Sequence, residues 1–263
     1  MAYSFDDLVR VMETLRSENG CPWDKKQDMH SMRKYVLEEA YEVVQAIDDE
    51  DSKELCEELG DLLFQIVFQA QLGKEKNDFD INDVANGICT KMVKRHPHIF
   101  GQTDSEGNIV KPDSEKVLNN WEVSKKIEKG FKTNTDVLNA VPRALPPMMR
   151  AEKILYKAET SGFDVAKTDK SYADFDVLGD EIKGLEGLEK NEVEEKIGEI
   201  LLKLVSVSRK LQINADFSLT KATEKFINKF KSIESSADED GLQLQEMTTE
   251  QKCVLWNRSK AAD

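Results

Sequence analysis

Two stretches of the sequence carry paired carboxylates at helical spacing. The segment LeuGluGluAlaTyrGlu contains Glu39 and Glu42, and GluGluLeuGlyAsp contains Glu58 and Asp61. Residues three apart share one face of a helix, so each stretch presents two carboxylates in one direction. A turn near Asp49 lets the two helices run antiparallel, and a rise of about 1.5 Å per residue then brings Glu42 and Glu58 to the same height. Four oxygen ligands converge, a donor set that favours Mg²⁺ or Mn²⁺ over zinc.

The alternative for these acids is a solvated surface, because the chain contains 51 Asp and Glu residues and most acids are exposed. Asp61 argues against it. This residue directly precedes the apolar run Leu62–Phe68, which predicts a largely buried helix. A buried carboxylate needs a cation, and the segment Glu54–Phe68 contains no Lys, Arg or His. We therefore expect a metal ion to neutralise the cluster.

A carboxylate-bridged di-iron centre is a rival for inward-facing acids in a helical protein. Such a centre normally takes a Glu-x-x-His pair from each of two helices. The three histidines are His30, His96 and His98, and none follows a glutamate at that spacing. The sequence excludes the di-iron alternative.

Two cationic pairs lie downstream of the carboxylates. Lys91 and Arg95 are four residues apart near the end of a helix expected over 81–95, and Trp121 and Lys125 repeat this spacing. Phosphates held by a metal need cations on their other side, and a tryptophan can stack on a nucleobase. A lone tryptophan is usually part of a core and a lone lysine is usually solvated, so these pairs have meaning only together with the carboxylates.

The segments that must position these residues are helical in pattern. Apolar residues recur at helical spacing between Pro22 and Pro97 and again after Met148, and no stretch alternates like a strand for long. The predicted fold class is all-α. Ser52 is expected to cap the second carboxylate helix, and Pro97 to end the helix over 81–95.

Composition limits the function. The 263 residues carry a net charge of -14, which argues against a protein that binds nucleic acid polymers through their phosphates. The four cysteines form no CxxC pair, so no zinc site or disulfide framework is indicated and a reduced, cytoplasmic location fits best. The first residues carry acids where a signal peptide needs bases, and no apolar run reaches about 20 residues, so neither a signal peptide nor a membrane segment is expected.

A weak internal repeat divides the chain. The motif at Gly20 recurs at Gly162, and Glu39 is matched by Glu181. Further matches follow at slowly shrinking offsets, as expected for a duplication with trimmed loops. They pair Asp61 with Glu199, Lys91 with Lys225, Arg95 with Lys229, Trp121 with Trp256 and Lys125 with Lys260. We predict an N-terminal domain over 1–130, a linker over 131–147 and a C-terminal domain over 148–263.

The motifs taken together closely resemble the MazG family of nucleoside triphosphate pyrophosphohydrolases. The segments that carry the resemblance are Gly20–Asp24, Leu37–Glu42, Glu58–Phe68, Lys94–Phe100 and Trp121–Lys125. The resemblance spans both halves of the chain. It implies four-helix domains that form a homodimer, and Mg²⁺-dependent hydrolysis of NTPs and dNTPs to the monophosphate and pyrophosphate.

By this resemblance, the expected metal ligands are Glu39, Glu42, Glu58 and Asp61. The residues expected to meet the nucleotide are Glu38, Lys91, Arg95, Trp121 and Lys125. In the expected reaction, water attacks the α-phosphorus, with Glu38 orienting or deprotonating it, while the cations neutralise the departing pyrophosphate.

The second half departs from the family pattern. It keeps Asp180 and Glu181 but has Gly184 where Glu42 stands, and it has Lys196 in place of Glu58. With two of four ligands gone, and a lysine that repels Mg²⁺, the C-terminal half is expected to be degenerate. The N-terminal half is then the catalytic one.

Two other functions stay open at this stage. One is a nucleotide-binding regulatory module that has lost catalysis in both halves and acts through its dimer. The other is a helical scaffold with acidic faces, which predicts no effect of metal. The intact ligand set of the first half disfavours both.

Overall fold

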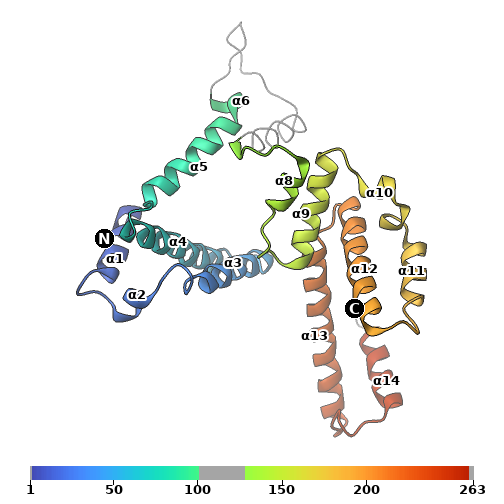
Figure 1. Ribbon diagram of the computed structural model, residues 1–263. Helices are drawn as coiled ribbons and strands as arrows, with labels where there is room; N and C mark the ends of the chain where they lie inside the picture. Colours follow the sequence, from blue (N-terminus) through green and yellow to red (C-terminus); the bar gives the residue numbers. More distant parts are fainter. Residues whose placement is uncertain (1, 101–127, 261–263) are drawn as a thin grey trace. The chain divides into compact units, whose positions relative to one another are not determined.

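The computed structural model describes residues 2–100 and 128–260, and every regular element in them is helical (Figure 1). This confirms the all-α fold class. Trp121 and Lys125 lie outside the described residues. The chain forms two compact units, Met1–Ser124 and Lys125–Asp263. None of the helices in the described ranges is long and apolar enough to cross a membrane.

The first unit is built around a pair of antiparallel helices, α3 and α4, that run side by side (Figure 1). The turn between them passes through Glu50, which has a φ of 56°. This confirms the expected helical hairpin. The helices of the unit are α1 (Phe5–Arg16), α2 (Pro22–Lys26), α3 (Arg33–Asp48), α4 (Ser52–Glu75), α5 (Ile81–Arg95) and α6 (Pro97–Phe100).

The caps of α4 and α5 follow from short polar side chains. The Asp51 carboxylate accepts hydrogen bonds from the backbone N–H groups of Lys53 and Glu54, at 2.9 and 3.0 Å. Asp51 is therefore the N-cap of α4, and the expectation that Ser52 caps this helix is wrong by one residue, because the carboxylate next to it is the group that reaches both donors. Helix α5 ends at Arg95 as predicted, before Pro97.

One face of α4 supplies much of the core of the first unit. Val67, Phe68 and Leu72 are fully or almost fully buried with Met12 of α1 and Met32. Close packing at the end of α4 depends on a glycine. A side chain at Gly73 would stand 2.8 Å from the ring and the carbonyl oxygen of Phe79, so only glycine lets the following turn fold back here.

The opposite face of α4 is not buried. Leu59, Leu63 and Ile66 are between 37% and 49% exposed, and Asp61 beside them is exposed as well. The expectation that this helix is largely buried and that Asp61 is a buried carboxylate is wrong. The helix is apolar around most of its circumference, but within the described residues only one face of it is buried.

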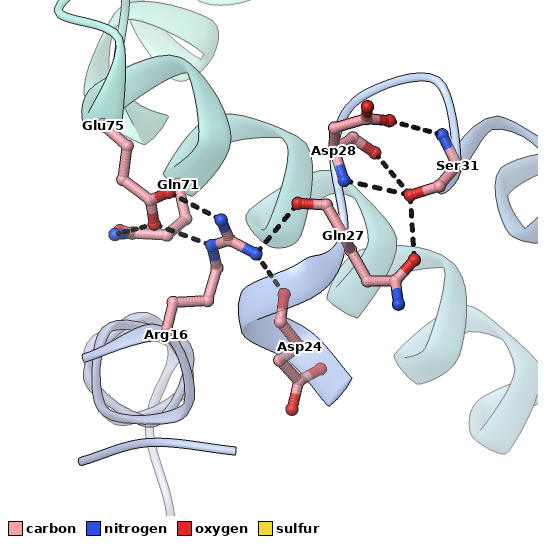
Figure 2. A network of polar contacts seen from close by, with 7 residues as sticks. All are labelled: Arg16, Asp24, Gln27, Asp28, Ser31, Gln71 and Glu75. Carbon is pink, nitrogen blue, oxygen red and sulfur yellow. Dashed lines mark hydrogen bonds and ion pairs between the residues drawn. The ribbon is translucent and has the colours of Figure 1, made fainter. Parts of the chain in front are cut away.

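A guanidinium group ties three helices of the first unit together (Figure 2). Arg16 of α1 forms an ion pair with Glu75 of α4 at 2.6 Å. It also donates to the backbone oxygen of Asp24 in α2 and, at 3.3 Å, to that of Gln27. The Arg16 side chain is only 7% exposed, so these contacts fix α2, the helix that carries the GlyCysProTrpAsp motif, against α1 and α4.

The second unit contains eight short and long helices in the described range. The stretch 131–147, predicted as a linker, carries α8, which packs against α9, and Val141 within it is buried. This stretch therefore belongs to the second unit. The elements are α8 (Asn134–Asn139), α9 (Pro147–Thr160), α10 (Val165–Thr168), the 3-10 helix η1 (Lys170–Tyr172), α11 (Phe175–Lys183), α12 (Lys190–Lys210), α13 (Ala215–Glu239) and α14 (Thr249–Lys260).

Helices α4 and α12 share one burial register. Ile197, Leu201 and Leu204 of α12 are 38% to 42% exposed and fall at the repeat positions of the exposed residues of α4. Val205 is buried at the position of Val67, and Lys203 at that of Gln65. Agreement between the exposed and buried positions supports the predicted repeat independently of residue identity.

Candidate metal and nucleotide site

Three of the predicted ligands come together in the α3–α4 hairpin. Carboxylate oxygens of Glu39, Glu58 and Asp61 all lie within 4.8 Å of one another. Glu39 is on α3 and the other two are on α4, so the antiparallel pairing of the helices makes the cluster. Opposite ligands of one Mg²⁺ ion are about 4.2 Å apart, so small side-chain rotations suffice to close the three groups on a single ion.

The cluster concentrates negative charge. Burial and the charges of Asp61 and Glu42 raise the pKa of Glu39 above its usual value. Burial and the charges of Glu42 and Asp61 likewise raise the pKa of Glu58. Within the described part of the chain, none of the three clustered carboxylates forms an ion pair. Among the described residues the cluster has no cationic partner, and a hard divalent cation fits such a set of oxygen donors.

Glu42 is close to this cluster without being one of its three members. Its charge acts on both Glu39 and Glu58, and its side chain lies within hydrogen-bonding reach of Glu39. Glu38 is exposed on α3 beside Glu39. The hairpin therefore brings together the four residues predicted as ligands, while Glu38 is not among the residues that act on the cluster.

Gln65 is a polar residue at the cluster that the sequence analysis did not single out. It lies one turn beyond Asp61 on α4 and is only 6% exposed. Its Nε2 donates to Glu39 Oε1 at 3.3 Å, while its buried Oε1 accepts no hydrogen bond. The sequence could have indicated this residue, because Gln65 is the one polar residue within the apolar run Leu62–Phe68 and a buried polar group normally has a hydrogen-bond partner.

The predicted cations are not part of the described cluster. Lys91 is exposed and Arg95 half-buried on α5, which follows the end of α4 opposite Glu58 and Asp61. The distance along α4 from Asp61 to Glu75 is about 20 Å at the helical rise. Of the second-unit counterparts, Lys229 lies with its Nζ 4.9 Å from the ring centroid of Trp256, whereas the side chain of Lys260 lies outside the described residues.

In the second unit, Glu181, the counterpart of Glu39, forms an ion pair with a lysine. Lys203 of α12 is 7% exposed, and its Nζ donates to Glu181 Oε1 at 2.5 Å. Burial lowers the pKa of Lys203, but the hydrogen bond and charge of Glu181 outweigh it and raise the pKa above its usual value. Lys196, expected to occupy the metal position, is exposed. The cation at Glu181 is Lys203.

The rest of the second ligand set is also absent from α11. Gly184 is the C-cap of this helix, so α11 ends where α3 continues and carries Glu42. In the described part of the second unit, no three acidic, histidine or cysteine side chains converge as they do in the first. This fits the predicted loss of the metal site.

Comparison with known proteins identifies the family. Residues 27–100, which hold the whole cluster, match the model of the MazG nucleotide pyrophosphohydrolase domain. The chain is 37% identical over 260 residues to the nucleoside triphosphate pyrophosphohydrolase/pyrophosphatase MazG of Thermotoga maritima, covering 98% of this chain and 96% of that protein. This chain belongs to the MazG family.

Other relatives match over nearly the same extent of this chain. The nucleoside triphosphate pyrophosphohydrolase of Escherichia coli K12 is 38% identical over 260 residues, covering 97% of this chain and 96% of that protein. The uncharacterized protein YabN of Bacillus subtilis is 37% identical over 263 residues, which are 99% of this chain and 52% of YabN. The MazG resemblance therefore extends through the second unit, although the family model matches only residues of the first.

Proposed function

We propose that this MazG protein is a nucleoside triphosphate pyrophosphohydrolase that converts NTPs and dNTPs to monophosphates and pyrophosphate. The observation that carries the proposal is the convergence of Glu39, Glu58 and Asp61, none of which has an ion-pair partner among the described residues. Relatives that match nearly the whole chain bear the name of this activity.

In this proposal the N-terminal unit holds Mg²⁺, or Mn²⁺ in its place, through Glu39, Glu42, Glu58 and Asp61. When bound, the ion neutralises triphosphate oxygens and acidifies water. Glu38, which is exposed and directly precedes Glu39 on α3, orients or deprotonates the water that attacks the α-phosphorus. The bond from the α-phosphorus to the bridging oxygen breaks, and pyrophosphate leaves.

The proposed nucleotide contacts lie further along the chain. Lys91, Arg95 and Lys125 neutralise the departing pyrophosphate, and Trp121 stacks on the base. Since α5 leaves α4 at the end away from the carboxylates, we propose that a homodimer completes the site. The exposed apolar face of α4 supports such a dimer, because Leu59, Leu63 and Ile66 offer a surface that a second copy can cover.

The test is product analysis of the full chain with each standard NTP and dNTP, in Mg²⁺ and in EDTA. We expect Mg²⁺-dependent monophosphate and pyrophosphate from the wild type and none from Glu42→Gln. The matched control is Glu57→Gln, an exposed glutamate of the same hairpin, which should retain activity. Activity in Glu42→Gln equal to that of the control would contradict the proposed site.

A second outcome would favour the binding-module alternative. If no nucleotide yields product while Mg²⁺ with nucleotide still raises the melting temperature, the chain binds without turnover. If neither product nor a thermal shift appears, the acidic hairpin has only a structural role.

A further inference from the structure

At one repeat position both units have a buried polar residue, which is neutral in the first unit and positively charged in the second. Gln65 and Lys203 occupy the same repeat position, four residues after Asp61 and Glu199 respectively. Both are buried in the same register of their helices, at 6% and 7% exposure. Both donate to the matched acid of the preceding helix, Gln65 to Glu39 at 3.3 Å and Lys203 to Glu181 at 2.5 Å.

The chemistry of the two donors has different consequences for the acid. A glutamine amide directs a carboxylate but leaves its charge uncompensated, and the unpaired Oε1 of Gln65 remains buried beside the cluster. A lysine ammonium compensates the charge itself. Around Lys203, the Tyr172 ring centroid lies 5.7 Å from Nζ, and Asp169 adds a second nearby negative charge. The ammonium thus sits in a closed cation site that the chain fills by itself.

We propose that the residue at this repeat position determines which cation compensates the acid of each hairpin. With Gln65, the α3–α4 hairpin binds a metal ion from solution; with Lys203, the α11–α12 hairpin uses the ammonium group of its own lysine. Gln65 is a positioning residue that holds Glu39 for a metal ion, and Lys203 is a permanent replacement for that ion in the second unit. The inference rests on the proposed metal site of the first unit. The inference gives the second unit a metal-independent structural role, because Lys203 already compensates the negative charge of Glu181.

The experiment moves the lysine into the first unit. In the full chain, Gln65→Lys places an ammonium beside Glu39, and Gln65→Met is the matched control that removes the amide without adding charge. Mn²⁺ binding is measured by the loss of the free-ion electron paramagnetic resonance signal. We expect Gln65→Lys to weaken Mn²⁺ binding at least tenfold more than Gln65→Met does.

Hydrogen exchange with mass spectrometry reads the two hairpins separately. Mn²⁺ should slow exchange in wild-type α3–α4 peptides and leave α11–α12 peptides unchanged. In Gln65→Lys, α3–α4 should no longer respond to Mn²⁺. In Lys203→Gln, exchange in α11–α12 should accelerate because Glu181 loses its cation, and Lys203→Gln with Glu181→Gln should restore part of the protection.

The outcomes separate the two proposals. A wild-type chain that binds no Mn²⁺ would overturn the metal site and this inference with it. Wild-type binding that Gln65→Lys and Gln65→Met weaken equally would overturn the inference alone. If Gln65→Lys does not fold, the second unit still decides, because protection of wild-type α11–α12 by Mn²⁺, or unchanged exchange in Lys203→Gln, would contradict the role of Lys203.

Discussion

The folded chain disfavours the ionised form of the Glu39 and Glu58 side chains. Burial and like charges raise the pKa of both, so in the absence of metal the folded chain binds protons there more tightly than the unfolded chain does. A carboxyl group of this kind stabilises the fold below its unfolded pKa, and this contribution is lost as pH rises through the folded pKa. At neutral pH the two ionised carboxylates therefore destabilise the fold, a cost that the proposed metal ion would offset.

The pH dependence of one substitution tests this sign. In EDTA at pH 7, Glu58→Gln should raise the melting temperature above that of the matched variant Glu57→Gln, because it removes a repelled charge. The difference should shrink as pH falls from 7 toward 4.5, where the wild-type carboxyl becomes neutral. Calorimetry at a series of pH values measures it, and a difference that grows as pH falls would show that Glu58 is not repelled by its neighbours.

At the residue scale, the spacing of the acids predicted correctly which of them share a helix face, but the sequence did not predict which side chains are buried. The three-residue spacing of Glu58 and Asp61 correctly placed both on the face that meets Glu39. The apolar run after Asp61 did not reveal that Asp61 is exposed, because hydrophobicity does not tell which apolar residues a single chain covers. Lys203 was missed because a lone lysine in a helix is usually solvated, and only its contact with Glu181 distinguishes it.

At the scale of elements, the end of α4 depends on the absence of a side chain. Gly73→Ala would place a methyl group against the ring and carbonyl of Phe79, and overpacking of this kind costs roughly 1–3 kcal/mol. The matched control is Gly87→Ala on α5, where, among the described residues, nothing beyond the chain neighbours and the local backbone of the helix lies within 4 Å of the added carbon. There the exchange should stabilise by roughly 0.5–1 kcal/mol. Urea unfolding of both variants measures the difference, and equal midpoints would contradict the packing at Gly73.

The contact of α2 with its neighbours depends on one side chain. Arg16→Met removes the ion pair with Glu75 and leaves the carbonyl oxygens of Asp24 and Gln27 without this donor. We expect a loss of about 1–3 kcal/mol, the usual cost of leaving buried partners unsatisfied. Arg10→Met is the control, because Arg10 is exposed and pairs only within its own helix. Comparable losses in both variants would contradict a bridging role for Arg16.

The order of the helices could be predicted because it depends on local signals. Pro97 marks the end of α5, and the acidic turn near Asp49 marks the hairpin. The cap of α4 was misassigned by one residue because Asp51 and Ser52 are both good N-caps and only geometry separates them. The prolines around α8 predict a linker, but α8 packs against α9, and no local sequence pattern indicates this tertiary contact.

At the scale of the whole molecule, α4 and α12 each expose a row of apolar side chains through which two copies of the chain could associate. Leu63→Asp places a charge in the exposed stripe of the first unit, and Leu201→Asp does so at the matched position of the second. We expect Leu63→Asp to convert the proposed homodimer to monomer, as measured by light scattering after gel filtration. A dimer that persists in Leu63→Asp but dissociates in Leu201→Asp would place the interface on the second unit.

A cation that is covalently part of the chain is never captured from solution. Its local concentration at Glu181 is fixed by the length and folding of the chain, and the entropy of placing it is lost once, when α11 and α12 pack together. A site filled by a free ion instead gains stability with the logarithm of the ion's concentration. If the proposed metal site of the first unit is correct, a chelator or a change in free Mg²⁺ acts on that unit, while the hairpin that contains the Lys203–Glu181 pair keeps its own cation.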